Sequence, residues 1–188
     1  MMQKTLTPDQ VRATKRSEKR KAEKEVVANR PKRKTSAQFY AGYLATPPAP
    51  AQSELFERHD KAVLSIRLPL APGANNLKSI RQLPGRAPFL VPSTQFNAYK
   101  KAVAKFWGDH WKGCPPEPLT GRLRVLILVH QVRKGGDVAN REKALCDSLS
   151  ECGAWGDDSQ IDDLRVLRGD VIPGVGALDV TIETILGS

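Results

Sequence analysis

The stretch RLRVLILVHQVRKGGD, residues 122–137, connects an apolar run to a polar turn. Apart from Arg124, residues 123–129 are apolar on both faces of the expected strand, which is typical of a central strand covered on both sides. The strand leads into two glycines and Asp137, a residue type that caps the first turn of helices. We therefore expect a buried strand whose following helix begins at Asp137.

The segment after Asp137 has a helical pattern over residues 138–152. Its apolar positions Leu145, Leu149 and Cys152 repeat at steps of three and four residues, so we expect them to form the buried face. Gly153 follows and is predicted to end the helix.

Upstream residues predict a strand, a hairpin and another helix. Residues 61–70 alternate in polarity, and Pro84-Gly85-Arg86 is the expected turn of a hairpin. Ser93 is a candidate N-cap for a helix that ends before the prolines of residues 114–118. We interpret the large side chains on one face of this helix as core residues rather than as a platform for stacking bases. These side chains are Phe96, Tyr99, Val103, Phe106 and Trp107.

Two further strands are expected downstream, at residues 161–169 and 177–185. The order strand, hairpin, helix, strand, helix, strand, strand predicts an α+β fold. We expect a single small domain, residues 59–188, in which two main helices pack on a mixed sheet.

The basic charge is concentrated near the N-terminus. The 188 residues carry a formal net charge of +10, and residues 1–35 contribute +8 of it. Residues 14–34 predict a transient helix or a disordered segment, and the prolines of residues 46–52 predict a stiff linker. We therefore expect a basic, flexible N-terminal extension, residues 1–58, in which only the apolar segment 38–44 could dock on another surface.

Two interpretations of this extension stay open. It is either a leader without a fixed role, or a tail that contacts DNA or a partner protein. A basic tail on DNA would add affinity through phosphate contacts without sequence preference. The excess of positive charge favours a polyanionic partner.

Composition and cysteine spacing argue against several other classes of protein. No apolar run approaches the roughly 20 residues that span a bilayer, and no apolar segment follows the basic N-terminus as in a secretion signal. The cysteines are Cys114, Cys146 and Cys152, which form no CxxC pair and no even set. We therefore expect a reducing, cytoplasmic compartment and no zinc site.

Acidic residues cluster after the second predicted helix. A helix and a turn can bring Asp158 back toward Asp137, and like charges about 4 Å apart cost several kcal/mol unless a proton or cation is shared. Carboxylate oxygens and water are the ligands that Mg²⁺ prefers. A metal site is therefore one interpretation of this cluster.

The other interpretation is a solvated acidic turn. Asp162 and Asp163 lie close in sequence to Arg165 and Arg168, and for these two acids we favour ion pairing over metal binding.

Residues 137–166, DVANREKALCDSLSECGAWGDDSQIDDLRV, resemble the active-site segment of RusA-type Holliday-junction resolvases. In that family an Asp-x-Asp-Asn motif opens a helix and a lysine follows three residues after the asparagine. A Gly-x-Trp-x-Asp-Asp-x-x-(Ile/Val) turn then leads into the next strand. The spacing between the two acidic motifs matches without a gap. The positions in register are Asp137, Asn140, Lys143, Gly153, Trp155, Asp157, Asp158, Gln160, Ile161 and Asp163.

The resemblance implies a homodimer that acts on four-way DNA junctions by Mg²⁺-dependent phosphodiester hydrolysis, with Mn²⁺ able to substitute. It also implies a cytoplasmic protein encoded by a bacterium or a phage. The strand pattern agrees more weakly across residues 60–185, and the first 60 residues have no counterpart.

The resemblance also implies roles for individual residues. Asp137 and Asp158 would ligate the metal, with Asp157 as the nearest substitute ligand. Lys143 would stabilise negative charge on the phosphoryl oxygens. Asn140 would orient the first acidic loop or bind a ligand. We expect Trp155 to pack in the turn rather than to contact DNA.

Ala139 departs from the family pattern, which has a second Asp at this catalytic position. Because alanine has no side-chain oxygen, we expect the chain to bind metal weakly and to cut slowly or not at all. The chain is either an engineered inactive variant or a natural protein that lost activity or recruited Asp157. We favour the first, because Lys143 and Asp158 are intact.

Three hypotheses for function follow. The leading one is a junction-resolving endonuclease impaired at Ala139. The second is a non-catalytic protein that binds branched DNA on the same fold. The third is a general basic factor for RNA or DNA whose acidic turn is only surface.

Overall fold

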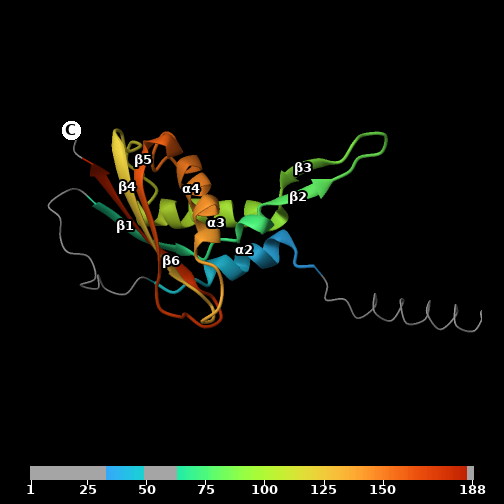
Figure 1. Cartoon of the computed structure of the whole chain (residues 1–188), viewed down its shortest axis with the longest axis horizontal. Coiled ribbons are helices and arrows are strands. Elements are labelled where there is room, and N and C mark those ends of the chain that lie inside the picture. Colours follow the sequence, from blue (N-terminus) through green and yellow to red (C-terminus); the bar gives the residue numbers. More distant parts are fainter. Residues whose placement is uncertain (1–32, 49–62, 186–188) are drawn as a thin grey trace, which may run out of the picture. The chain divides into compact units, whose positions relative to one another are not determined.

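A mixed four-stranded sheet and the helices packed on it make up the compact unit that begins at Thr35. The computed structural model describes residues 33–48 and 63–185, so the predicted basic tail and most of the linker lie outside the described residues. None of the described helices is long and apolar enough to cross a membrane. The elements, labelled as in Figure 1, are α2 (Ser36–Leu44), β1 (Val63–Pro69), η1 (Ala74–Asn76), β2 (Lys78–Arg81), β3 (Phe89–Pro92), α3 (Thr94–His110), β4 (Arg122–His130), η2 (Ala139–Arg141), α4 (Glu142–Glu151), η3 (Asp158–Gln160), β5 (Ile161–Arg168) and β6 (Ala177–Ile185).

The sheet has the strand order β1-β6-β4-β5. β4 and β5 are parallel, and the other neighbours are antiparallel. The parallel pair is joined through α4, because parallel strands need a long crossover. The predicted α+β class, the mixed sheet and the separate hairpin of β2 and β3 are confirmed.

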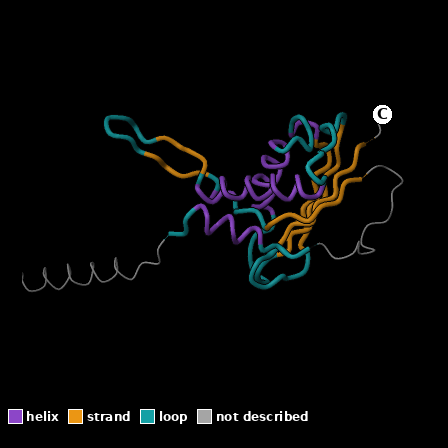
Figure 2. Tube along the Cα trace, turned by 180° about the vertical axis from the view of Figure 1, so that it is seen from behind, coloured by secondary structure: helices purple, strands orange, loops and turns teal. Residues whose placement is uncertain are grey.

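α3 and α4 lie on one side of the sheet, as Figures 1 and 2 show. Alternate residues of β4 are fully buried in the resulting core, namely Leu123, Val125, Ile127 and Val129. Leu126 and Leu128, on the opposite face of the strand, are only half-buried. The prediction that this strand is covered on both faces is therefore wrong, because the described helices cover one face alone.

Ser93 begins α3 as predicted. Its Oγ accepts a hydrogen bond from Phe96 N at 3.0 Å, which satisfies an amide of the first turn. The aromatic stripe belongs to the core, since Phe96, Tyr99 and Trp107 are buried, although Phe106 is only partly buried.

α2 docks on α3. Tyr43 of α2 meets Tyr99 of α3 edge-on, with ring centroids 5.2 Å apart. Thr35 caps α2 in a reciprocal pair of hydrogen bonds with Gln38. The compact unit therefore starts before the boundary expected between residues 58 and 59, because the apolar segment 38–44 finds its partner in the core.

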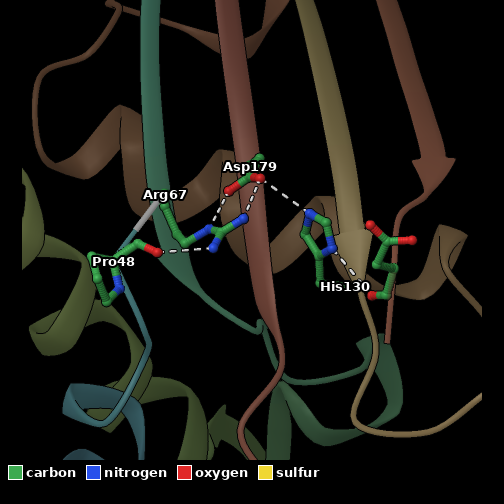
Figure 3. Close-up of polar contacts among 5 residues, drawn as sticks. Pro48, Arg67, His130 and Asp179 are labelled. Carbon is green, nitrogen blue, oxygen red and sulfur yellow. Dashed lines mark hydrogen bonds and ion pairs between the residues drawn. The ribbon is translucent and has the colours of Figure 1, made fainter. Parts of the chain in front are cut away.

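A network of charged and polar groups crosses β1, β6 and β4 on the face opposite α3 and α4 (Figure 3). Arg67 Nη2 donates to Asp179 Oδ2 at 2.6 Å, and Arg67 Nη1 donates to the carbonyl of Pro48 at 3.0 Å. His130 Nε2 lies 3.0 Å from Asp179 Oδ2, and its Nδ1 lies 3.1 Å from the carbonyl of Asp170. A buried charge is tolerated only with such partners. The network thus fixes the end of β4, where the next loop begins.

Candidate functional site

The loop between β4 and α4 is held by hydrogen bonds from Gln131 and Arg168. Gln131 Nε2 donates to the carbonyl of Asp137 at 3.3 Å. Arg168 Nη2 donates to the carbonyl of Gly136 at 2.7 Å, and its Nη1 donates to that of Lys134 at 3.3 Å. The predicted pairing of Arg168 with an acid of the turn is therefore wrong, because the end of β5 lies beside this loop. Gly136 has φ of +119°, a conformation that side chains disfavour.

Asp137 lies just before a short turn and does not cap α4 itself. Its Oδ1 accepts a hydrogen bond from Ala139 N at 3.0 Å, and its Oδ2 accepts one from Asn140 Nδ2 at 2.7 Å. These bonds stabilise the 3₁₀ turn η2, and α4 begins only at Glu142. The expected start of the helix directly after Asp137 is therefore wrong. The hydrogen bond between Asp137 and Asn140 favours a 3₁₀ turn, which is tighter than a turn of α-helix, ahead of α4.

Lys143 is an exposed residue of the first turn of α4. Its Nζ donates to Asp147 Oδ1 at 2.7 Å, and this hydrogen bond raises the pKa of Lys143. The negative charge of Asp158 acts in the same direction. An exposed i,i+4 pair stabilises a helix only weakly, so the ammonium can exchange Asp147 for another anion at little cost.

Asp158 lies along the face of α4 that carries Lys143, Cys146 and Ser150. Its Oδ1 accepts hydrogen bonds from Ser150 Oγ at 2.8 Å and from Trp155 Nε1 at 3.0 Å. Trp155 is 1% exposed, so the predicted packing role of this residue is confirmed. Burial raises the pKa of the Cys146 thiol to about 12, and the charge of Asp158 adds to the shift.

Ser150 is a residue of this site that the sequence analysis missed. It lies four residues after Cys146 and seven after Lys143, which is the helical spacing that places it on their face. That spacing could have identified it once Asp158 was expected beside the helix.

Asp157 and Gln160 build the turn that presents Asp158. Asp157 Oδ1 accepts a hydrogen bond from Ser159 N at 2.8 Å, and the contact with Ser159 lowers the pKa of Asp157. Gln160 Oε1 accepts one from Asp157 N at 3.0 Å, and Gln160 Nε2 donates to the carbonyl of Leu119 at 3.0 Å. Asp157 Oδ1 is therefore already engaged in a cap.

Asp162 and Asp163 bind arginines of β4 and β5. Arg122 pairs with Asp162. Arg165 and Arg124 pair with Asp163 at 3.0 and 2.8 Å, so the expected Arg165 pairing is confirmed. Hydrogen bonds from these arginines lower the pKa values of both carboxyl groups.

The remaining carboxylates do not make a complete metal-binding group. Within residues 33–48 and 63–185, no three His, Cys, Asp or Glu side chains gather where they could hold a metal ion. Ala139 contributes only its backbone N–H, which donates a hydrogen bond to Asp137 Oδ1. The residues present therefore do not fit a divalent-metal site that needs three carboxylates. At position 139, alanine stands where the family motif has a carboxylate.

Comparison with known proteins extends the resemblance beyond these motifs. The family described as endodeoxyribonuclease RusA matches residues 69–183. The chain is also 41% identical over 64 residues to the crossover junction endodeoxyribonuclease rusA of Enterobacteria phage HK97. That alignment covers 34% of the chain and 52% of the phage protein, so the chain spans about half the length of this curated relative. Because the family match covers most of the chain, the protein belongs to the RusA endodeoxyribonuclease family.

Proposed function

We propose that this protein is a structure-specific endonuclease that recognises four-way DNA junctions and hydrolyses their phosphodiester bonds, with activity reduced by Ala139. One observation carries the proposal: within a family match over residues 69–183, most of the acidic and basic motif is retained. The retained residues are Asp137, Asn140, Lys143 and Asp158.

A divalent cation, Mg²⁺ or Mn²⁺, would polarise the scissile phosphate and activate water in a complete site of this kind. Asp137 and Asp158 would supply two of the carboxylate ligands, and Asp157 is the nearest further candidate. With alanine at position 139 the set lacks a carboxylate. We therefore expect weak metal binding and slow cleavage in the present chain.

Lys143 is proposed to bind the phosphate that is cut. Its ammonium is exposed, its pKa is raised by the hydrogen bond to Asp147, and it lies within the electrostatic influence of Asp158. A cation in this position would stabilise negative charge on the phosphoryl oxygens. Asn140 holds the Asp137 carboxylate and would keep it in place as DNA binds.

A second candidate function is non-catalytic binding of branched DNA. The observation that favours it is the absence, among the described residues, of any three-residue metal-binding group. It predicts tight junction binding that depends steeply on salt but not on divalent ions.

We propose further that two copies act together, because two strands of a junction are cut at symmetric positions and a twofold dimer matches a twofold substrate. The basic N-terminal residues would add DNA affinity without sequence preference, or would contact a partner protein. A cytoplasmic location in a bacterium or a phage-infected cell suits this role.

The test is the Ala139→Asp variant, incubated with a synthetic four-way junction and Mg²⁺. Ala139 is exposed, so a carboxylate can be added there without displacing the core. The matched control is Ala139→Asn, which adds similar volume without charge. We expect Ala139→Asp to cut the junction roughly 100-fold faster than either the present chain or Ala139→Asn.

Two results would contradict this expectation in different ways. If Ala139→Asp binds junctions well but leaves them uncut, the non-catalytic alternative is correct. If the chain binds junctions no better than linear duplex at one salt concentration, both junction hypotheses are wrong.

A further inference from the structure

The hairpin of β2 and β3 projects from the helical side of the molecule, as Figures 1 and 2 show. β2 is exposed along its whole length, and β3 is exposed at all but one position. Among the residues that the structure describes, the two strands pair only with each other. A two-stranded hairpin without a core of its own is marginally stable in water, so such an arm is expected to have a partner.

Large apolar side chains are exposed on this arm. Ile80 and Leu90 are directly opposite each other in the ladder and are 75% and 62% exposed. Phe89 is 41% exposed and Leu83, near the tip, is 36% exposed. An apolar group held away from the core in this way marks an interaction site.

The arm is also cationic. Residues 78–92 contain Lys78, Arg81 and Arg86 and no acidic residue. No side-chain hydrogen bond or ion pair joins these three cations to any other described residue, whereas Arg122 and Arg165 on the sheet are paired with acids. The unneutralised charge favours a polyanion as the partner.

The base of the arm is fixed beside the candidate site. Leu77 is buried, and its carbonyl accepts a hydrogen bond from Ser93 N at 2.8 Å, which closes the hairpin at its base. η1, which precedes β2, lies against η2, the turn whose Ala139 N–H donates to Asp137. Arg141 of η2 also donates to the carbonyl of Ala71. DNA bound at Asp137 would therefore lie close to the base of the arm.

We propose that this hairpin is an arm that contacts the branch point of a four-way DNA junction. The phosphates of the DNA duplexes that meet at the branch point are bound by Lys78, Arg81 and Arg86. Ile80 and Leu90 pack on the faces of DNA bases that are exposed at the branch point, where base stacking is interrupted. Apolar side chains inserted at a base step are an established way to recognise distorted DNA, and a step that is already unstacked costs less to open. This inference rests on the proposed junction binding and identifies the hairpin as the element that recognises the branch point.

The experiment uses two variants of the full chain. The charge variant is Lys78→Ala/Arg81→Ala/Arg86→Ala, and the apolar variant is Ile80→Thr/Leu90→Thr, which keeps β propensity. The control removes the same charge from the exposed surface of α3 and the residues after it, in Lys101→Ala/Lys105→Ala/Lys112→Ala. Affinities are measured for a four-way junction and for linear duplex of the same composition. A 2-aminopurine base at the branch reports unstacking.

We expect the charge variant to weaken junction binding about tenfold or more and to reduce the salt dependence, while the control changes affinity less than about threefold. The apolar variant should weaken junction binding about tenfold, leave duplex binding unchanged, and abolish the rise in 2-aminopurine fluorescence. A further variant, Arg81→Lys/Arg86→Lys, should retain affinity because the charge is kept. All positions are exposed, and thermal unfolding checks that each variant folds.

Three outcomes would overturn the proposal. If the present chain prefers junctions and every hairpin variant keeps that preference, the arm does not read the branch, although the proposed function stands. If the apolar variant has half the molar mass of the unmodified protein in solution, the hairpin contacts a second copy of the chain and not DNA. Failure of the unmodified chain to prefer junctions over duplex would remove the proposed function together with the arm.

Discussion

Asp137 and Asp158 are each held by two hydrogen bonds, but the donors differ in origin. The donors to Asp137 are its near neighbours Ala139 and Asn140, so the orientation of its carboxylate is set locally. The donors to Asp158 are Ser150 of α4 and the buried Trp155. The geometry at Asp158 therefore depends on the packing of one large side chain in the core.

Trp155→Ala is expected to lower the free energy of unfolding by about 3–5 kcal/mol, because it leaves a large cavity and removes a donor to Asp158. Urea denaturation of the folded protein measures this loss. The control is Phe89→Ala on the exposed hairpin, which should change stability by less than about 0.5 kcal/mol. Equal stability of the two variants would show that Trp155 does not anchor the turn.

At the scale of elements, β5 controls the loop that follows β4. Arg168 donates hydrogen bonds to the carbonyls of Gly136 and Lys134, while Gln131 donates one to the carbonyl of Asp137. The two parallel strands thus share a loop at one end, where the first carboxylate of the motif is presented.

Arg168→Ala is expected to increase amide hydrogen exchange of residues 133–137 about tenfold, because two hydrogen bonds to the loop are lost. Arg168 is exposed, so global stability should fall by less than about 1 kcal/mol. In the Ala139→Asp background the junction-cleavage rate should fall in parallel. Arg168→Lys, which can donate to one carbonyl, should give an intermediate result. Unchanged exchange in the loop would mean that Arg168 does not position it.

The elements that could be predicted from the sequence are those whose signals are local. The alternation in residues 61–70 and 177–185, the turn at Pro84-Gly85-Arg86 and the cap at Ser93 each specify structure within a few residues. Local patterns of this kind are reliable because the backbone itself imposes the period.

Tertiary partners could not be predicted in the same way. Docking of α2 on α3 depends on Tyr43 meeting Tyr99, which are far apart in sequence. Arg168 was expected to pair with an acid, but the fold places a loop of carbonyl groups within its reach. The late start of α4 also escaped prediction, since the Asp137–Asn140 hydrogen bond competes with a regular first turn.

At the scale of the whole molecule, three acidic side chains of the described residues are tied to hydrogen-bond donors near the surface. Asp157 is bound by Ser159, Asp162 by Arg122, and Asp163 by Arg165 and Arg124, and each contact lowers the pKa of the carboxyl group below its usual 3.8. A carboxyl group whose pKa is lower in the folded state than in the unfolded state stabilises the folded state at pH values above its unfolded pKa. That contribution is lost as the pH falls through 3.8 toward the folded pKa.

Thermal stability is therefore expected to be insensitive to pH above about 5 and to fall between about pH 4.5 and 2.5. The double variant Asp162→Asn/Asp163→Asn should flatten this acid limb, because an amide does not titrate. Calorimetry across the pH range measures both curves. A variant with the same slope as the unmodified chain would show that these ion pairs do not contribute to acid sensitivity.

The most direct test of the account is the rate of four-way junction cleavage by Ala139→Asp, with and without Asp158→Asn in the same chain. If a single missing carboxylate limits an otherwise retained nuclease site, Ala139→Asp cuts with Mg²⁺, and the added Asp158→Asn returns the rate to that of the unmodified chain while junction affinity is kept. Cleavage that persists undiminished in the double variant, or no gain from Ala139→Asp at all, would contradict the assignment of these residues to one catalytic site.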